Sequence, residues 1–423
     1  MKYKKNQIVD AIYTNTDTNN PFIEALPEKV AKQDFIKETT YRPQLLSSEY
    51  DVDSKLNYLN NIRAFSYSFD YMYEVYSDLY DCIIDNYKTK NTYMFLKQNI
   101  NMPSQQFFIN SRTMSLLGTP GIGKSSTIKK CLDFFPKMIS HTNYKNQSIY
   151  FKQIPYLYIE CPFDCSVKSF ALKIMTEIDA VAGTDYSKIY IETRYTIESI
   201  INYIEKMCTF FHFGVIVIDE IQNVVLAALK KKQTRLLMKV VLGLSNSSCS
   251  SLYFSGTLEA EQLFESEEYL KRRTLGKRLL PLKKDKIYYL FLTDLWKCKI
   301  INEINLTKEL ASGLYEITEG IPFYIVEMFI LMQKEYLLSE DDKIDLRFIK
   351  KIADKYNVHV YPEKEGGMSI SDFAIKDKEA KKVGRPVLIK ENDDITGIYE
   401  KAKNINELIS KLDEIGLIER STI

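Results

Sequence analysis

Histidine is rare in this chain and its cysteines are scattered, so neither residue favours a structural metal site. The sequence holds 3 His and 7 Cys among 423 residues. Cys161 and Cys165 form the closest cysteine pair, and no second pair completes a four-ligand zinc site. We therefore expect free thiols in a reducing, cytoplasmic compartment.

Long apolar runs and an excess of charge are also missing. No run approaches the ~18 apolar residues that a membrane span requires. No apolar core follows the basic residues 1–5, as it would in a signal peptide. The net charge is +1, so no global field attracts nucleic acid, and any DNA contact has to come from a local patch. The length of 423 residues and the hydrophobic content of 45% predict two or three domains with a buried core.

A phosphate-binding loop is indicated at residues 118–125, which read GTPGIGKS and fit G-x-x-x-x-G-K-[ST]. Residues 113–117 before it are typical of a short buried strand, and residues 126–134 after it of a helix. We expect the loop's N–H groups to wrap the phosphates of ATP, Lys124 to reach the β- and γ-phosphates, and Ser125 to bind Mg²⁺. The nucleotide-binding candidates are Gly118, Thr119, Pro120, Gly121, Ile122, Gly123, Lys124, Ser125 and Ser126. A glycine-rich turn without a ligand is the alternative, and spacing and flanks both count against it.

A second nucleotide-binding element follows the apolar residues 214–218, which predict a buried parallel strand. The strand runs directly into Asp219 and Glu220. At the carboxyl end of a strand, Asp219 can hold Mg²⁺ and Glu220 can polarise the attacking water. One carboxylate neutralises charge while the other positions the nucleophile, which favours hydrolysis over two merely solvated acids.

A further strand is predicted at residues 252–256. In the additional-strand class of NTPases, such a strand inserts between the P-loop strand and the Asp-Glu strand. Ser255 and Thr257 lie at its tip, where a hydroxyl would contact the γ-phosphate or the lytic water. Thr257 is the preferred candidate and Ser255 the alternative.

A basic segment over residues 271–278 offers a residue for a neighbouring subunit's site. In a ring ATPase, an arginine at this point stabilises transition-state charge in the adjacent subunit. Arg273, Arg272 and Arg278 are the candidates, and the sequence does not separate them. A solvated basic face or a DNA-facing one is the alternative.

The predicted fold class is α/β, a parallel sheet flanked by helices. A helical N-terminal extension, a small helical lid and a charged C-terminal tail are expected around this core. The expected divisions are an N-terminal extension for partner docking (1–85), an α/β nucleotide-binding core (86–286), a small helical lid (287–360) and a charged tail (361–423). Within the extension, the proline-bounded residues 20–27 are expected to be extended and docked on another surface. Residues 56–87 are expected to be helical, with their aromatic side chains in a core or interface.

These elements together resemble the AAA+ ATPases, and more closely the TnsC/TniB-type regulators of DNA transposition. The resemblance is carried by residues 20–27 (NPFIEALP), 159–168 (IECPFDCSVK), 178–179 (ID), 183–186 (GTDY), 218–222 (IDEIQ), 244–246 (LSN) and 255–260 (SGTLEA). It covers about residues 20–335, and the P-loop alone would indicate only an NTPase. The resemblance implies an AAA+ P-loop core with a helical lid, using ATP and Mg²⁺.

The resemblance also implies a switch that acts on DNA. ATP-bound subunits would assemble as a ring or helical filament on duplex DNA, contacting phosphates without regard to sequence. That platform would join a target-selection protein of TnsD/TniQ type to a TnsA/TnsB-type transposase, and hydrolysis would disassemble it. The charged tail is the expected transposase-binding segment.

The candidate DNA contacts come from the segment that lines the pore in related ATPases. They are Lys168, Lys173, Lys188 and Arg194. Solvated helix faces are the alternative for all four. Residues 230–232 (KKK) form another possible patch, and residues 384–386 (GRP) suggest a minor-groove contact.

One departure from the family pattern concerns the lid. Many AAA+ proteins place a sensing arginine after a Gly-x-Pro, whereas here Gly320-Ile321-Pro322 is followed by Phe323. Slow hydrolysis or reliance on a neighbour's arginine would follow. Two rival functions stay open: a helicase loader or replication initiator, which would normally carry a winged helix after the lid, and a signalling NTPase that does not bind DNA.

Overall fold

The computed structural model describes ten stretches of the chain. These are residues 7–14, 18–44, 51–90, 112–163, 165–192, 195–247, 250–261, 274–339, 344–358 and 368–369. The chain divides into two compact units: unit 1 holds residues 1–30, 72–118 and 124–278, and unit 2 holds residues 31–71, 119–123 and 279–423. The functional divisions expected at residues 85, 286 and 360 stay a prediction.

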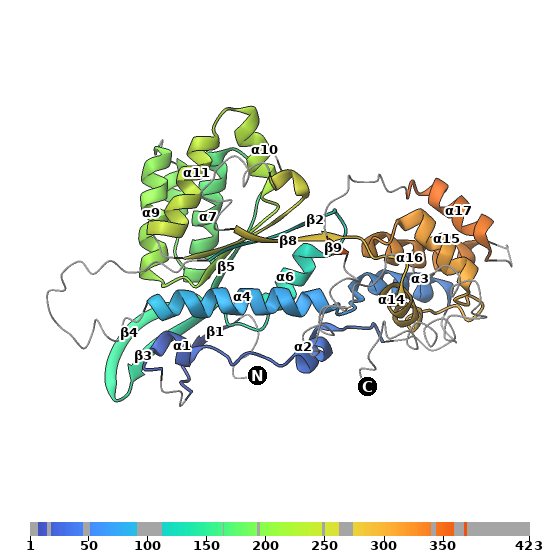
Figure 1. The fold of residues 1–423 in the computed structure, drawn as a ribbon, viewed down its shortest axis with the longest axis horizontal. Helices are drawn as coiled ribbons and strands as arrows, with labels where there is room; N and C mark the ends of the chain where they lie inside the picture. The colour runs from blue at the N-terminus through green and yellow to red at the C-terminus, as the bar shows by residue number, and fades with distance from the viewer. Residues whose placement is uncertain are drawn as a thin grey trace, which may run out of the picture. The chain divides into compact units, whose positions relative to one another are not determined.

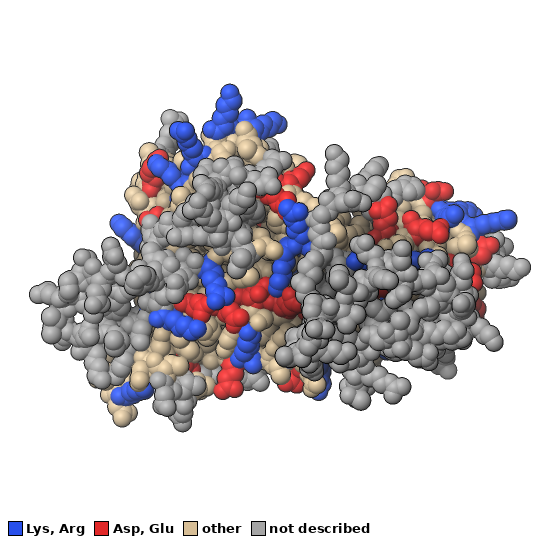
Figure 2. Space-filling model, in the orientation of Figure 1, with Lys and Arg blue, Asp and Glu red and all other residues tan. Residues whose placement is uncertain are grey.

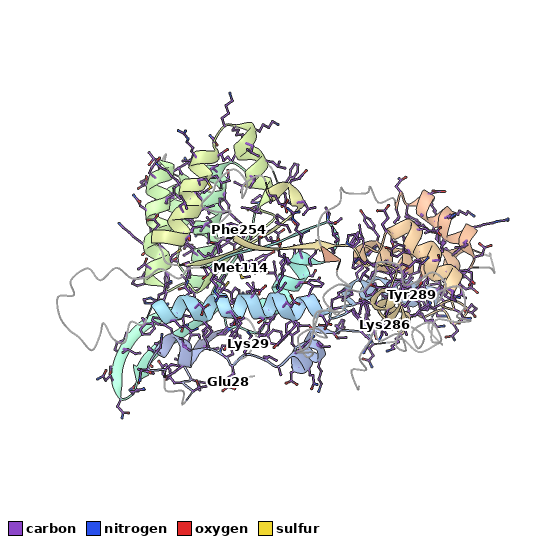
Figure 3. All side chains as sticks on the ribbon, in the orientation of Figure 1. Glu28, Lys29, Met114, Phe254, Lys286 and Tyr289 are labelled. Atoms are coloured by element: carbon purple, nitrogen blue, oxygen red, sulfur yellow. The ribbon has the colours of Figure 1, made fainter. Side chains whose placement is uncertain are left out.

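Unit 1 is built on a twisted sheet with the order β5-β6-β7-β2-β8. The strands are β5 (Tyr156–Glu160), β6 (Val215–Asp219), β7 (Ser251–Gly256), β2 (Thr113–Gly118) and β8 (Thr274–Leu280). The pairs β5–β6, β6–β7 and β7–β2 are parallel. Every residue of β6 and of β7 is buried, as strands covered on both faces require. The insertion of β7 between β2 and β6 confirms the expectation from sequence; Met114 and Phe254 lie in this region (Figure 3).

Helices cover one face of this sheet in a layer that Figure 1 shows above it. They are α7 (Val167–Ala182), α8 (Tyr186–Glu192), α9 (Ile197–Phe210), α10 (Gln222–Lys230) and α11 (Thr234–Leu242), followed by a π-helical turn (Gly243–Ser247). Their apolar side chains form one buried cluster with β5, β6 and β7. Burial of the apolar surface in this cluster is the main favourable contribution to packing the helices on the sheet.

The opposite face is covered by α6 (Lys124–Leu132) and α4 (Asp70–Thr89) (Figure 1). The side-chain amide of Asn86 on α4 donates to the Gly214 carbonyl oxygen at 2.7 Å. Acidic side chains along α4 neighbour basic ones on the surface (Figure 2), as in the pair of Lys29 and Asp81, whose charged atoms are 2.9 Å apart. The bond from Asn86 thereby fixes α4 to the residue that precedes β6.

A second, three-stranded sheet in unit 1 has the order β1-β3-β4. It consists of β1 (Ile8–Asp10) and the hairpin of β3 (Met138–Tyr144) and β4 (Gln147–Gln153). Beside it lies α1 (Pro21–Ala25), so the expectation of an extended segment at residues 20–27 is wrong. Asn20 caps this short helix by accepting from the Phe22 N–H. The expected docking is confirmed, since the fully buried Phe22 ring stacks on Tyr87 with centroids 5.3 Å apart.

Unit 2 begins with α2 (Lys32–Thr39), α3 (Val52–Asn61) and a 3-10 turn (Ile62–Ala64). The single helix expected over residues 56–87 is therefore interrupted between this turn and α4. The reason is tertiary: Ser66 forms a bridge with Tyr41, and the rings of Phe65 and Phe69 pack on Phe291 at centroid distances of 5.8 and 5.5 Å. The aromatic side chains of residues 56–87 are buried or half-buried, in line with the expected core or interface; the buried ones are Tyr58, Phe69, Tyr71, Tyr76 and Tyr87.

The remaining helices of unit 2 are α14 (Lys286–Trp296), α15 (Lys308–Thr318), α16 (Pro322–Leu338) and α17 (Leu346–Lys355). All four fall in or at the start of residues 287–360, where a helical lid was expected. At the end of β8, Leu279 and Leu280 pair with β9 (Met368–Ser369). Among the helices described, none is both long and apolar enough to span a membrane.

Candidate nucleotide site

The phosphate-binding loop joins the end of β2 to the start of α6. Gly121 and Gly123 have φ angles of +80° and +98°, which residues with a side chain rarely adopt. A Cβ added to Gly121 would also lie 3.1 Å from Cγ2 of Ile321. Both glycines are therefore required by the backbone path, as the motif predicted.

Lys124 opens α6 and is almost fully buried in unit 1. Its Nζ donates to the Gly118 carbonyl oxygen at 2.6 Å, which satisfies one of its donors at the strand–helix junction. Ser125 and Ser126 follow in the first turn of α6, where backbone N–H groups lack helical partners. A helix start of this kind favours an anion.

Asp219 ends β6 with no exposed surface. Its Oδ1 accepts from the Glu220 N–H at 3.0 Å, and its Oδ2 accepts from the Tyr158 hydroxyl at 2.7 Å. Burial and this bond to Asp219 raise the pKa of Tyr158, so its hydroxyl stays protonated and remains a donor. Asp219 is thus oriented by its neighbours on β5 and in the following turn.

Glu220 has a φ of +54°, a strained backbone conformation for a residue with a side chain. Its Oε2 accepts from Nε2 of Gln222, and Oε1 of Gln222 accepts from the Thr257 N–H at 3.1 Å. The Ile221 N–H donates to the Ser255 carbonyl oxygen at 3.0 Å. These bonds join the ends of β6 and β7. Sequence reasoning gave no role to Gln222, although it ends the stretch 218–222, and it missed Tyr158, which no motif spacing marks.

The two hydroxyl candidates at the tip of β7 differ in their surroundings. Ser255 is fully buried, and its Oγ has no hydrogen-bond partner among the described residues. Thr257 is half-buried and its Oγ1 lies 3.4 Å from Oε2 of Glu259. The choice of Thr257 as the γ-phosphate sensor stays a prediction.

The residues present fit a nucleotide with Mg²⁺ on their donor chemistry. Hydroxyl and carboxylate oxygens, the ligands that Mg²⁺ prefers, are supplied by Ser125 and Asp219. Lys124 supplies the cation for the phosphates, and the two positive-φ glycines shape the loop between them. Glu220 lies directly after Asp219, as a residue that polarises water would.

One of the three candidate arginines, Arg278, lies among the described residues. Arg278 lies on β8 and pairs with Glu261, with Nη2 and Oε2 2.7 Å apart. Arg272 and Arg273 lie outside the described residues. A role of Arg278 in a neighbour's site would require that its pair with Glu261 open.

Two of the candidate DNA contacts have acidic partners on their own helices or turns. Lys173 lies 2.6 Å from Glu177, and Lys188 lies 2.9 Å from Asp185. Such pairs lower the charge available to a phosphate. Arg194 lies outside the described residues.

The other basic candidates are differently placed. Lys168 is half-buried in the first turn of α7. Residues 230–232 are exposed at the end of α10, where Figure 2 shows basic side chains projecting from the surface. Residues 384–386 are outside the described part. Binding of DNA by any of these residues stays a prediction.

Phe323, which replaces the sensing arginine, lies in the first turn of α16 in unit 2. Its N–H donates to the Gly121 carbonyl oxygen at 3.2 Å, and its Cβ would lie 3.2 Å from a Cβ at Gly121. The lid helix thus contacts the loop through its backbone and an apolar ring, with no cation from this position.

Comparison with known proteins finds a family model that matches part of the chain. The model of a family described as AAA domain matches residues 110–264. No curated protein matches the chain. Among solved structures, a Walker-type ATPase of Pyrococcus abyssi is 13% identical, with a TM-score of 0.37, over 64% of this chain and 71% of that one.

The ORC2 protein of Aeropyrum pernix is similar at the same distant level. Its structure with ADPNP and ADP is 10% identical, with a TM-score of 0.36, over 76% of this chain and 71% of that one. Its ADP form is 9% identical, with a TM-score of 0.38, over 73% and 81%. The family match and the strand order carry the assignment: the chain contains an AAA domain, the nucleotide-binding core of an AAA+ P-loop NTPase.

Proposed function

We propose that this chain hydrolyses ATP and uses the hydrolysis to regulate its assembly on duplex DNA during transposition. The observation that supports hydrolysis is the pair of carboxylates at the end of β6. Asp219 is buried and oriented by two hydrogen bonds, while Glu220 is held by Gln222 beside the tip of β7. A binding module without hydrolysis would not need a second carboxylate restrained in this way.

The roles of the chain's own residues follow from their chemistry. Lys124 and the backbone N–H groups of residues 121–125 would bind the phosphates, and Ser125 and Asp219 would hold Mg²⁺. The bound ion supplies charge neutralisation of the phosphate oxygens. Glu220 orients the attacking water and accepts its proton, and Thr257 contacts the γ-phosphate.

The role in transposition rests on the TnsC/TniB-like stretches of the sequence. The helix α1 (Pro21–Ala25) lies within one of them, residues 20–27, and the packing of its Phe22 on Tyr87 anchors the N-terminal segment to α4. The proposed partners are duplex DNA, further copies of the chain, a TnsD/TniQ-type target-selection protein and a TnsA/TnsB-type transposase. Residues 361–423 are the proposed transposase-binding tail.

Electron microscopy with duplex DNA and a non-hydrolysable ATP analogue tests this function. Regular oligomers on DNA that form with the analogue and not with ADP are expected. Nucleotide-dependent oligomers without DNA would indicate the signalling NTPase instead. Loading of a replicative helicase onto DNA, with no effect on transposase recruitment, would indicate the loader.

Two variants separate binding from hydrolysis. Lys124→Ala should abolish ATP binding and DNA association in a filter-binding assay, because the phosphates lose their cation. Glu220→Gln should keep ATP bound and hold the assemblies on DNA. Unchanged ATP binding in the first variant would remove the P-loop assignment.

A further inference from the structure

A buried glutamine connects Thr257, proposed to contact the γ-phosphate, with Glu220, proposed to orient the attacking water. Gln222 is the first residue of α10 and is 6% exposed. Its amide nitrogen donates to the Glu220 carboxylate, and its amide oxygen accepts from the Thr257 N–H. Both polar ends of one rigid amide are therefore committed to the site.

We propose that Gln222 is a positioning residue that couples the tip of β7 to the Glu220 carboxylate and so controls the hydrolysis step. This inference rests on the proposed ATPase activity. It assigns a role to a residue that neither phosphate nor metal binding requires. Among the described residues, no other side chain donates a hydrogen bond to the Glu220 carboxylate.

The surroundings of Gln222 hold its amide in one place. A Cβ at Gly256 would lie 2.3 Å from Oε1 of Gln222, so a side chain at residue 256 would displace the amide from its present position. The Ile221 N–H donates to the Ser255 carbonyl oxygen at 3.0 Å, which fixes the start of α10 against β7. The close packing limits the amide to the orientation that serves both partners.

Because the Gln222 amide bonds to both partners, a movement of Thr257 is transmitted to the Glu220 carboxylate. The two heteroatoms of the amide share one carbon, so a shift of the Thr257 backbone rotates or pulls the group that restrains Glu220. Contact of Thr257 with a phosphate would therefore alter the position of the carboxylate. Since misplacement of a catalytic group by about 1 Å can cost ~10²-fold in rate, loss of this bond should lower kcat.

Gln222→Met removes both hydrogen bonds at nearly constant volume. We expect kcat to fall by roughly 10-fold to 100-fold, while the dissociation constant for a fluorescent ATP analogue changes less than about 3-fold. Gln153→Met is the matched control: Gln153 is also fully buried in unit 1 and makes two amide hydrogen bonds, to Phe22 and His141, outside the site. The control should lower the melting temperature and leave kcat within about 3-fold of the parent protein.

Gln222→Glu adds a readout that a purely structural role would not move. A carboxylate at this position cannot donate to Glu220, whereas a carboxylic acid can, and two adjacent carboxyl groups readily share one proton. The activity of this variant relative to the parent should rise as pH falls from about 8 to about 6. The relative activity of Gln222→Met should stay constant over that range.

A double-mutant cycle with Glu220→Gln decides whether Gln222 acts through Glu220. If it does, Gln222→Met lowers kcat no further in the Glu220→Gln background. Independent losses in both backgrounds, or a fall in nucleotide affinity equal to the fall in kcat, would overturn the proposal. Absence of ATP hydrolysis by the parent protein would instead overturn the proposed function, and this inference with it.

Discussion

At the scale of single residues, the orientation of Asp219 depends on Tyr158. The Tyr158 hydroxyl is the donor to Oδ2, and its raised pKa keeps it protonated over the working range of the protein. Because loss of an outer-shell partner typically weakens metal binding by ~10–100-fold, Tyr158→Phe should raise the Mg²⁺ concentration for half-maximal ATPase activity by about 10-fold.

Titration of ATPase activity with Mg²⁺ measures this effect. Tyr156→Phe, at the beginning of the same strand, removes a hydroxyl away from the carboxyl edge and should leave the Mg²⁺ dependence unchanged. Identical titrations for both variants would exclude a role of Tyr158 in orienting Asp219.

The residues predicted from sequence are those whose roles follow from local spacing. Lys124, Asp219 and the positive-φ glycines lie where the motifs placed them, because a strand, loop or helix start determines their positions. Gln222 and Tyr158 act through contacts between strands that are far apart in sequence. No periodicity records such contacts, so these two residues could be found only from the fold.

At the scale of elements, α1 shows how one sequence signal can support two structures. Proline after asparagine was interpreted as an extended segment, yet proline at the first helical position after an asparagine cap is also a helix start. The choice is made by burial, because the helix places Phe22 against Tyr87. Asn20 also donates to the Tyr87 carbonyl oxygen at 2.8 Å.

Asn20→Ala should therefore destabilise unit 1. The variant loses the cap and the buried bond to Tyr87, so we expect the free energy of unfolding to fall by about 1–3 kcal/mol. Chemical denaturation measures the loss. Thr18→Ala is a nearby control, since Thr18 lies outside the helix and bonds to the Glu24 side chain from a more exposed position.

The hairpin of β3 and β4 was not predicted, because its turn gives a weak signal. Lys145 and Asn146 both have positive φ, at 48° and 64°, as a two-residue hairpin turn requires. Asparagine tolerates a positive φ, whereas lysine rarely adopts one. The pair also lacks the glycine that usually marks such a turn, which is why the signal is weak. The hairpin is stabilised instead by its packing around His141, which contacts Tyr13, Phe22 and Phe151.

This packing predicts a pH dependence of stability. Burial lowers the pKa of His141 from 6.5 to about 4, and it lowers that of His212 to about 4 as well. Below about pH 6.5 the unfolded chain binds protons that the folded chain does not, so stability falls with decreasing pH until about pH 4. The loss from pH 7 to pH 5 should be roughly 2 kcal/mol per histidine.

Urea denaturation at several pH values checks this expectation. In the structure, Nδ1 of His141 lies 2.8 Å from the Tyr13 hydroxyl and Nε2 lies 2.9 Å from Oε1 of Gln153, an arrangement that suits the neutral ring. His141→Asn should lower stability at pH 7 and remove about half of the pH-dependent loss. A pH dependence equal to that of the parent protein would contradict the assigned cause.

At the scale of the whole molecule, the place of β7 between β2 and β6 could be predicted, because it follows from the order typical of the additional-strand NTPases. Helices could be predicted in the lid from its sequence, although only α17 has a strongly amphipathic pattern and α16 is apolar on most of its surface. The grouping of residues 1–30 with the main sheet depends on long-range packing. Neither composition nor charge shifts sharply where that grouping begins or ends.

The last question at this scale is whether an arginine acts on a neighbouring subunit. Arg278 is held by Glu261 within its own unit, so it needs assembly to become available. If it acts in trans, Arg278→Ala and Glu220→Gln proteins are each inactive, with losses of ~10³-fold or more expected for the arginine. Mixing them on DNA should restore hydrolysis, because an intact Glu220 site then receives its arginine from the other variant.

Mixtures with Arg272→Ala or Arg273→Ala proteins test the other two candidates in the same way. Recovery by one of the three mixtures identifies the arginine. If Arg278 acts within its own subunit, its mixture stays inactive, because no single subunit then holds both Arg278 and Glu220.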